Sequence, residues 1–160
     1  MNWDRFASAA PDLAAIGVRR LEGPGVCLVG TLRKDGSPRI SPVEPMIVDG
    51  ELLLGMMWHS RKALDLLRDA RVTVHSVVTD RHGTEGDFKV FGRTAEVTEP
   101  GRRERYADAM HARIDWRPED PYHLFAVDIA TAGYVVFGDD PHALAWDPQG
   151  GVRRRAMPGS

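Results

Sequence analysis

The chain has 160 residues, 42% hydrophobic and 28% charged, which fits one globular domain and excludes a disordered or collagen-like chain. Its 21 Lys and Arg against 23 Asp and Glu give a formal charge of −2, without the basic excess that favours nucleic acid or a membrane surface as a partner. Cys27 is the only cysteine, so we expect no intramolecular disulfide. No apolar run approaches 18 residues, so we expect no membrane-spanning helix. Because the chain also opens without a signal-peptide pattern, we expect a cytoplasmic protein.

The first half of the chain predicts a helix followed by an antiparallel meander. Residues 4–20 carry apolar positions at loose helical spacing, with Pro11 as an interruption near the start. Three strand-like runs follow, at residues 26–32, 39–48 and 52–57. The pairs Asp35-Gly36 and Asp49-Gly50 separate these runs, and Asp-Gly supplies the left-handed dihedrals of a tight hairpin turn.

The second half of the chain adds two helices and more strands. A helix begins after Ser60, and its spacing predicts a buried face of Ala63, Leu66, Leu67 and Ala70. Further strands are predicted at residues 71–78, 86–97, 122–129 and 133–137, with a polar helix at 102–110 and a C-terminal tail at 139–160. The last two strands are neighbours or one bent strand. The pattern predicts one mainly β domain, 1–160: a closed or nearly closed antiparallel barrel of six or seven strands over about residues 25–138, with flanking helices.

The turn into the helix after Ser60 is the most informative feature. A helix N-terminus carries partial positive charge and favours an acidic residue in its first turn. Here the first turn holds Arg61 and Lys62 and no acid, which loses stability unless an anion binds to the backbone N–H groups and both cations. We favour a phosphate site over the alternative that both side chains extend into water. His59 lies beside it, either as a ligand contact or as an exposed loop residue.

A second polar segment lies upstream, at Arg39-Ile40-Ser41-Pro42. Strand alternation places Arg39 and Ser41 on one face and Ile40 on the other. Because Pro42 and Pro45 cannot donate to a sheet ladder, this stretch is expected at an edge or a bulge. Its open backbone groups can bind a flat polar heterocycle, although the segment taken alone favours an ordinary edge strand with a solvated arginine.

The two segments together, in this order, resemble the pyridoxamine 5′-phosphate oxidase-like family of flavin-binding split barrels. The resemblance covers roughly residues 8–138. Its most specific part is Ser60-Arg61-Lys62 followed by Leu66-Leu67-Arg68-Asp69-Ala70-Arg71-Val72. It implies a split β-barrel that forms a homodimer, with FMN, or the deazaflavin F420, in a groove of each subunit at the interface.

Carried over by position, the resemblance implies three sets of cofactor contacts. Four residues would line the isoalloxazine ring and ribityl chain: Arg39, Ile40, Ser41 and Pro42. Met57 and Trp58 would lie beside the ring, and the phosphate would be held by Ser60, Arg61 and Lys62. Trp146 is the candidate contact from the partner chain. The second copy would also enclose the cofactor, for which one domain of this size has little chain to spare.

The implied activity is hydride transfer between this cofactor and a small organic substrate, with no catalytic side chain assigned, since the cofactor carries the chemistry. Residues 150–155 only echo the C-terminal substrate-phosphate motif of true pyridoxamine phosphate oxidases, so vitamin B6 oxidation is not expected. The scattered histidines show no zinc-ligand spacing, so no metal is expected. Two alternatives remain open: a non-catalytic module that binds or sequesters a flavin or haem, and a dimerising scaffold. FMN and F420 also stay open, because Arg33, Arg61 or Arg153–Arg155 could pair with the acidic tail of F420.

Overall fold

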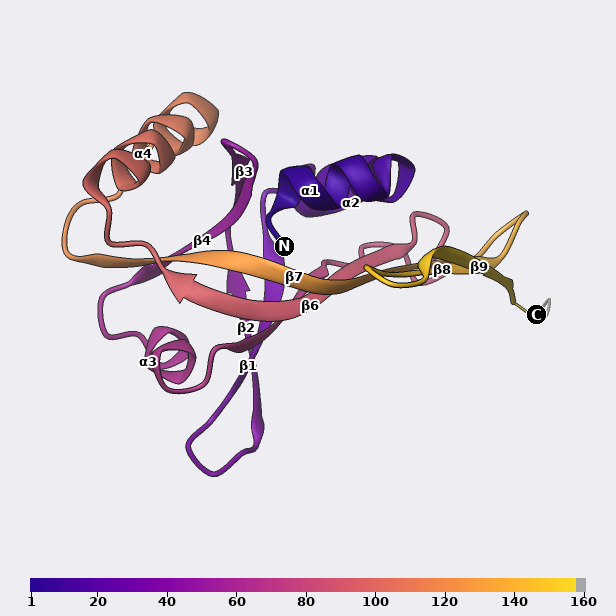
Figure 1. Ribbon diagram of the computed structural model, residues 1–160, viewed down its shortest axis with the longest axis horizontal. Coiled ribbons are helices and arrows are strands. Elements are labelled where there is room, and N and C mark those ends of the chain that lie inside the picture. Colours follow the sequence, from indigo (N-terminus) through magenta and orange to yellow (C-terminus); the bar gives the residue numbers. More distant parts are fainter. Residues whose placement is uncertain (158–160) are drawn as a thin grey trace.

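The computed structural model describes residues 1–157 and shows an antiparallel sheet with helices around it (Figure 1). The helices are α1 (Trp3–Ala9), α2 (Pro11–Glu22), α3 (Arg61–Arg68) and α4 (Pro100–Ile114). The strands are β1 (Cys27–Leu32), β2 (Pro38–Val43), β3 (Pro45–Val48), β4 (Glu51–Met57), β5 (Arg71–Ser76), β6 (Asp87–Glu96), β7 (Tyr122–Val136), β8 (His142–Asp147) and β9 (Gly151–Ala156). The predicted fold class, mainly β with flanking helices, is confirmed.

The sheet follows the path β2-β1-β5-β6-β7-β4-β3, with antiparallel pairing throughout. Its two end strands, β2 and β3, are consecutive in the chain and joined through Glu44. The sheet therefore curls until its two edges meet at Glu44, where no ladder joins β2 to β3 among the described residues. The result is a seven-stranded barrel that is split along one seam.

The run 39–48, predicted as one strand, forms two. Pro42 and Pro45 stand on either side of Glu44 and cannot donate to a ladder, so the chain leaves one strand and enters another at this point. Because β2 pairs with β1 and β3 pairs with β4, the predicted three-stranded meander is wrong, and two separate hairpins take its place. The two Asp-Gly turns are confirmed, each with a positive φ at its glycine.

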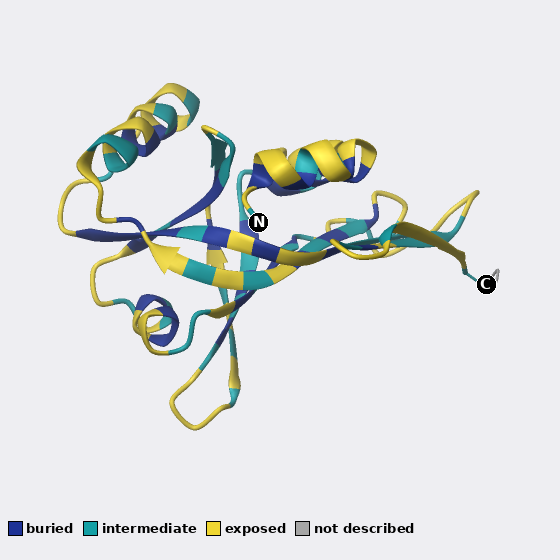
Figure 2. Ribbon diagram, viewed as in Figure 1, coloured by how far each residue is buried: buried dark blue, intermediate teal, exposed yellow. Residues whose placement is uncertain are grey.

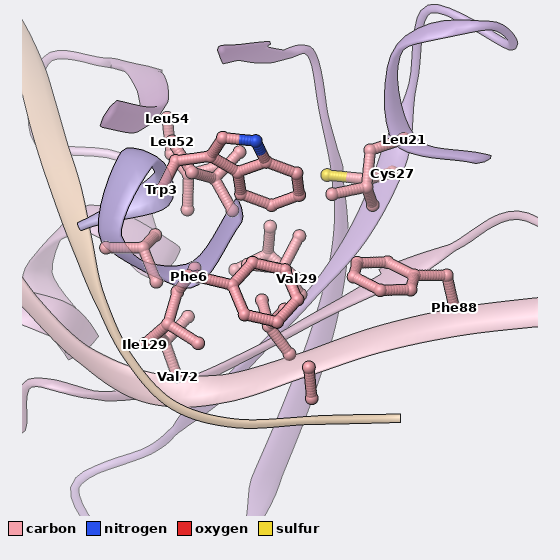
Figure 3. Close-up of a cluster of buried hydrophobic side chains, with 14 of the residues drawn as sticks. Trp3, Phe6, Leu21, Cys27, Val29, Leu52, Leu54, Val72, Phe88 and Ile129 are labelled. Atoms are coloured by element: carbon pink, nitrogen blue, oxygen red, sulfur yellow. The ribbon is translucent and has the colours of Figure 1, made fainter. Parts of the chain in front are cut away.

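Helices α1 and α2 cover the main hydrophobic core. The predicted N-terminal helix is broken in two, because Pro11 begins a new helix. Figure 2 shows the inward faces of both helices buried and their outward faces exposed. Trp3 and Phe6 of α1 pack edge-on to each other, and Trp3 packs edge-on to Phe88 of β6 (Figure 3). Cys27 lies in the same cluster and is fully buried, as expected of a small core residue. A second cluster packs under α4, on the other face of β4 and β7.

The C-terminal part differs from the predicted tail. Of the two alternatives for residues 122–137, the structure has the single strand, β7. The departure is that β8 and β9 form a hairpin paired to the C-terminal end of β7. Figure 1 shows this hairpin projecting at one end of the molecule. Residues 158–160 of the predicted tail lie outside the described residues. None of the helices within residues 1–157 is both long and apolar enough to cross a membrane.

Candidate functional site

The candidate anion site lies where β4 ends and α3 begins. The chain turns through Trp58 and His59, which has a φ of 55°, and Ser60 then takes the N-cap position with an extended backbone. The first turn of α3 contains no acidic residue, and no side chain within residues 1–157 caps it. The first backbone N–H groups of α3 therefore remain available to an anion.

Three side chains surround this helix end. Ser60 Oγ is shielded from solvent and has no hydrogen-bond partner within residues 1–157. Arg61 is exposed and enters none of the ion pairs in that part of the chain. Lys62 Nζ donates to the carbonyl oxygen of Pro42 at 3.2 Å, which holds a second cation between α3 and the end of β2. A buried hydroxyl without a partner costs about 1–3 kcal/mol, so this group favours a ligand that can bond to it.

Arg39 reaches α3 through a buried carboxylate that the sequence analysis missed. Asp65 is 4% exposed and accepts a hydrogen bond from Arg39 Nε at 2.6 Å. The same carboxylate accepts from Arg68 Nη2 at 3.0 Å and from Thr31 Oγ1 at 2.9 Å. Burial by itself would raise the pKa of Asp65, but the bonds from the two guanidinium groups and the hydroxyl outweigh it and lower that pKa below its ordinary value.

Asp65 also changes the predicted buried face of α3. Ala63 and Leu66 are buried as expected, whereas Leu67 is 47% exposed and Ala70 only partly buried. The inward position is taken by Asp65, because its bonds to β1 and β2 hold it against the sheet. The apolar spacing of the helix did not reveal this polar anchor.

A groove of about 460 Å³ passes Lys62 and the end of β2. Its walls come from β2, β4, α4 and the loop between α4 and β7. Four of its lining side chains are aromatic: Trp58, Tyr106, Trp116 and Tyr122. A groove of this volume is typical of small-molecule sites, which span about 300–1,000 Å³.

Among its lining residues within the described chain, the groove has three charged groups: Glu44, Lys62 and Glu119. Neither carboxylate forms an ion pair or a hydrogen bond with another residue between 1 and 157. Burial first, and then Tyr122 and the Glu44 carboxylate, raise the pKa of the Tyr106 phenol, so Glu44 lies near this ring. The groove is therefore aromatic and carries two unpaired negative charges.

Trp58 rests on a buried histidine. Its indole lies 4.3 Å from the His123 ring, centroid to centroid, with 13° between the planes, and it also stacks on His59 at 4.5 Å. His123 is 3% exposed, and its Nδ1 lies 2.6 Å from Glu96 Oε1. Its Nε2 is shielded and has no partner within residues 1–157. His123 has no local signal in the sequence, because it reaches Trp58 only through the pairing of β4 with β7, in which Met56 lies opposite His123.

The structure brings most of the predicted contacts together. Around the start of α3 lie Pro42, Met57, Trp58, Ser60, Arg61 and Lys62. Arg39, Ile40 and Ser41 follow on β2, an edge strand as expected, where Ile40 is 72% exposed.

Trp146 is the exception among the predicted contacts. It is 2% exposed and packs edge-on to Phe6, with 4.9 Å between ring centroids. It belongs to β8, and this placement buries it in the core of its own chain rather than near the start of α3. Within residues 1–157, no group of three or more His, Cys, Asp or Glu side chains is arranged to hold a metal ion.

Comparisons with known proteins agree with this fold. A family model described as pyridoxamine 5′-phosphate oxidase matches residues 18–136, and no curated protein matches the sequence. The conserved hypothetical protein Rv2991 from Mycobacterium tuberculosis is similar, with a TM-score of 0.64 at 19% identity over 84% of each chain. A protein related to general stress protein 26, of the pyridoxinephosphate oxidase family, from Clostridium acetobutylicum gives 0.66 at 15% identity over 86% of this chain and 95% of that one. A heme binding protein from Mycobacterium smegmatis gives 0.60 at 15% identity over 89% of this chain and 57% of that one.

Proposed function

The chain belongs to the pyridoxamine 5′-phosphate oxidase family, and on this basis we propose that it binds a flavin-type cofactor, FMN or the deazaflavin F420, with the cofactor phosphate at the start of α3. The observation that carries the proposal is the unpaired Ser60 hydroxyl at an acid-free helix N-terminus, next to Arg61 and Lys62. A phosphate fits this set of donors, because it accepts from the helix N–H groups and neutralises both cations.

The proposed activity is hydride transfer to or from a small organic substrate. When bound, a flavin-type ring supplies the hydride chemistry. The residues of this chain bind the phosphate, orient the ring along the end of β2 and exclude water with the aromatic walls of the groove. Lys62 is suited to the orienting role, since its contact with Pro42 ties the phosphate end to the strand beside which the ring would lie.

Titration of the purified chain with FMN, F420 and riboflavin tests the proposal. Riboflavin has the ring of FMN but no phosphate, so we expect it to bind more weakly than FMN. The double variant Arg61→Ala with Lys62→Ala should weaken FMN binding by about 1–3 kcal/mol per lost charge-assisted bond. The affinity of this variant for FMN should then be close to its affinity for riboflavin. Arg19→Ala is the matched control, because Arg19 is exposed on α2, away from the site. An unchanged FMN affinity in the double variant would refute the phosphate site.

The main alternative is a non-catalytic module of the same fold that binds haem or flavin. It is supported by the similarity to the heme binding protein from Mycobacterium smegmatis. The absorption spectrum of whatever purifies with the chain separates haem from flavin. Turnover with reduced cofactor against a panel of quinones and dyes separates an oxidoreductase from a binding module, because only an enzyme oxidises the cofactor repeatedly.

A homodimer would complete the enclosure of the cofactor. It is supported by a shallow hollow of about 440 Å³ on the sheet surface, lined by Ile40 of β2 and Phe91 of β6, which are 72% and 44% exposed. Apolar side chains grouped on an open sheet are typical of an interface. Sedimentation of the wild type and of Phe91→Glu tests this: the wild type should be a dimer and the variant a monomer, and a monomeric wild type would contradict it.

A further inference from the structure

The guanidinium of Arg39 is held at one end only. Its Nε donates to Asp65 Oδ2 at 2.6 Å, whereas Nη1 and Nη2 form no hydrogen bond with any other residue in the stretch 1–157. The side chain of Arg39 is 23% exposed, so both terminal nitrogens remain open to a ligand. A guanidinium in this arrangement can donate to two acceptor oxygens of one ligand, because its N–H groups form a planar fork.

Asp65 is the fixed partner of this pair. Its carboxylate is 4% exposed and accepts from donors on three elements: Thr31 of β1, Arg39 of β2 and Arg68 of α3 itself. Arg39 instead belongs to the edge strand β2, and its guanidinium has no other hydrogen bond within residues 1–157. The buried carboxylate therefore determines where the guanidinium lies, rather than the reverse.

The guanidinium lies one helical turn from the candidate anion site. Asp65 follows Arg61 by four residues, which places the two on the same side of α3, about 6 Å apart along its axis. At the N-terminal end of the helix, Lys62 Nζ donates to the carbonyl oxygen of Pro42, in the same strand as Arg39. These two contacts hold α3 beside β2. A ligand whose phosphate binds at the start of α3 therefore meets the free end of Arg39 about one helical turn further along.

From these observations we propose that Asp65 is a positioning residue for the ligand of this site: it fixes Nε of Arg39 and so presents Nη1 and Nη2 to the bound cofactor beside its phosphate. The inference rests on the proposed function, which supplies the phosphate at the start of α3. Asp65 acts only through Arg39, since its own carboxylate is buried and already bonded. Because Arg39 is restrained before the ligand arrives, binding loses less conformational entropy than it would with a mobile arginine.

Titration of FMN into a double-mutant cycle of the full chain tests this role. The cycle consists of the wild type, Asp65→Ala, Arg39→Ala and the double variant, each checked for folding by circular dichroism. We expect Asp65→Ala to weaken FMN about three- to tenfold in the wild-type background. In the Arg39→Ala background the same change should weaken FMN no further, because the carboxylate then has no guanidinium to orient. An equal loss in both backgrounds would overturn the proposal, since Asp65 would then act on the fold and not through Arg39.

Thr31→Val is the matched control. It removes another hydrogen bond of the same carboxylate, with nearly the same side-chain shape, and leaves the bond between Asp65 and Arg39 in place. Its FMN affinity should stay within about twofold of the wild type. A loss as large as that of Asp65→Ala would overturn the proposal, because weakening the buried network would then be sufficient by itself.

A second measurement needs no substitution of Asp65 and no ligand. Hydrogen exchange at arginine Nε, followed by nitrogen NMR of the wild type, should be slower for Arg39 than for Arg19, which is exposed on α2. The variants Arg39→Lys and Arg19→Lys assign the two signals. Equal exchange rates would overturn the proposal even where Asp65→Ala does not fold.

The two experiments also distinguish this inference from the proposed function. A wild type that binds neither FMN nor F420 would refute the flavin function, and the exchange at Arg39 Nε would still decide whether Asp65 restrains the arginine. FMN binding that is unchanged in Asp65→Ala would overturn the positioning role and leave the flavin function standing.

Discussion

Removing the Asp65 carboxylate should destabilise the fold more than removing any surface acid. Asp65→Ala deletes the acceptor of three hydrogen bonds, two of them from guanidinium groups. Breaking a fully buried ion pair by removing one partner costs about 3–5 kcal/mol. Because the Arg39 and Arg68 side chains are 23% and 39% exposed, water can solvate both after the change. We therefore expect a loss of about 2–4 kcal/mol in the free energy of unfolding.

Urea unfolding followed by circular dichroism measures this loss. The midpoint should fall for Asp65→Ala while the slope with urea stays the same, since the change alters stability rather than the surface exposed on unfolding. Asp65→Asn should lose less, because the amide oxygen still accepts one bond. Asp140→Asn is the matched control. Asp140 pairs with Arg154 but is well exposed, so the urea midpoint of this variant should equal that of the wild type. A loss below about 0.5 kcal/mol for Asp65→Ala would refute the reasoning.

The pH dependence separates charge from packing at Asp65. Because the folded-state pKa of Asp65 is lowered, its stabilisation is fully present above the ordinary Asp pKa of about 3.9 and is lost as the pH falls through the lower folded value. The stability difference between the wild type and Asp65→Asn should therefore shrink in acid. A difference that stays constant down to about pH 2 would mean that shape, rather than charge, accounts for the effect.

Two further predictions concern strands and acidic turns. Gly55→Ala should lower the free energy of unfolding in urea by about 1–3 kcal/mol, because a Cβ at Gly55 would overlap the Tyr106 hydroxyl. Gly133→Ala is the control and should be tolerated, since the atom nearest to its Cβ is 3.5 Å away. Equal losses in the two variants would refute the steric argument. Hydrogen bonds from Arg71 and Thr84 lower the pKa values of Asp69 and Asp80 to about 2, so their stabilisation is present above about pH 3.8 and is lost as the pH falls toward 2. The thermal midpoint of Asp80→Asn should therefore approach that of the wild type as the pH falls from about 3.8 toward 2. A difference in midpoint that stays constant over this range would contradict the role of the Asp80 charge.

Local signals in the sequence were sufficient for the fold class and for the acid-free N-terminus of α3. The Asp-Gly turns, the Ser60 N-cap and the absence of acid in the first turn of α3 depend on neighbouring residues only, and all are present in the structure. The β8–β9 hairpin was missed because its strands are short and polar on the exposed side, so their pairing with β7 has no local signature. The burial of Trp146 in the core was not expected for the same reason.

The groove side of the site could not be read from the sequence, because its residues meet only through tertiary contacts. Tyr106 comes from α4, Trp116 from the loop after it and His123 from β7. Each of these residues, taken in its own segment, looks like an ordinary core or surface aromatic. Asp65 was overlooked in the same way, since its partners Thr31 and Arg39 lie in β1 and β2.

The largest error in the predicted fold and the chemistry of the groove have one physical origin. Pro42 is the last residue but one of β2 and Pro45 is the first residue of β3, and the break between them turns the expected meander into a barrel that is split at Glu44. A residue inside a regular strand is flanked by a ladder on at least one side, whereas Glu44, at the seam, is exposed and lines the groove without a partner within residues 1–157. The break between the two prolines therefore splits the barrel and, at the same point, places an unpaired carboxylate in the groove.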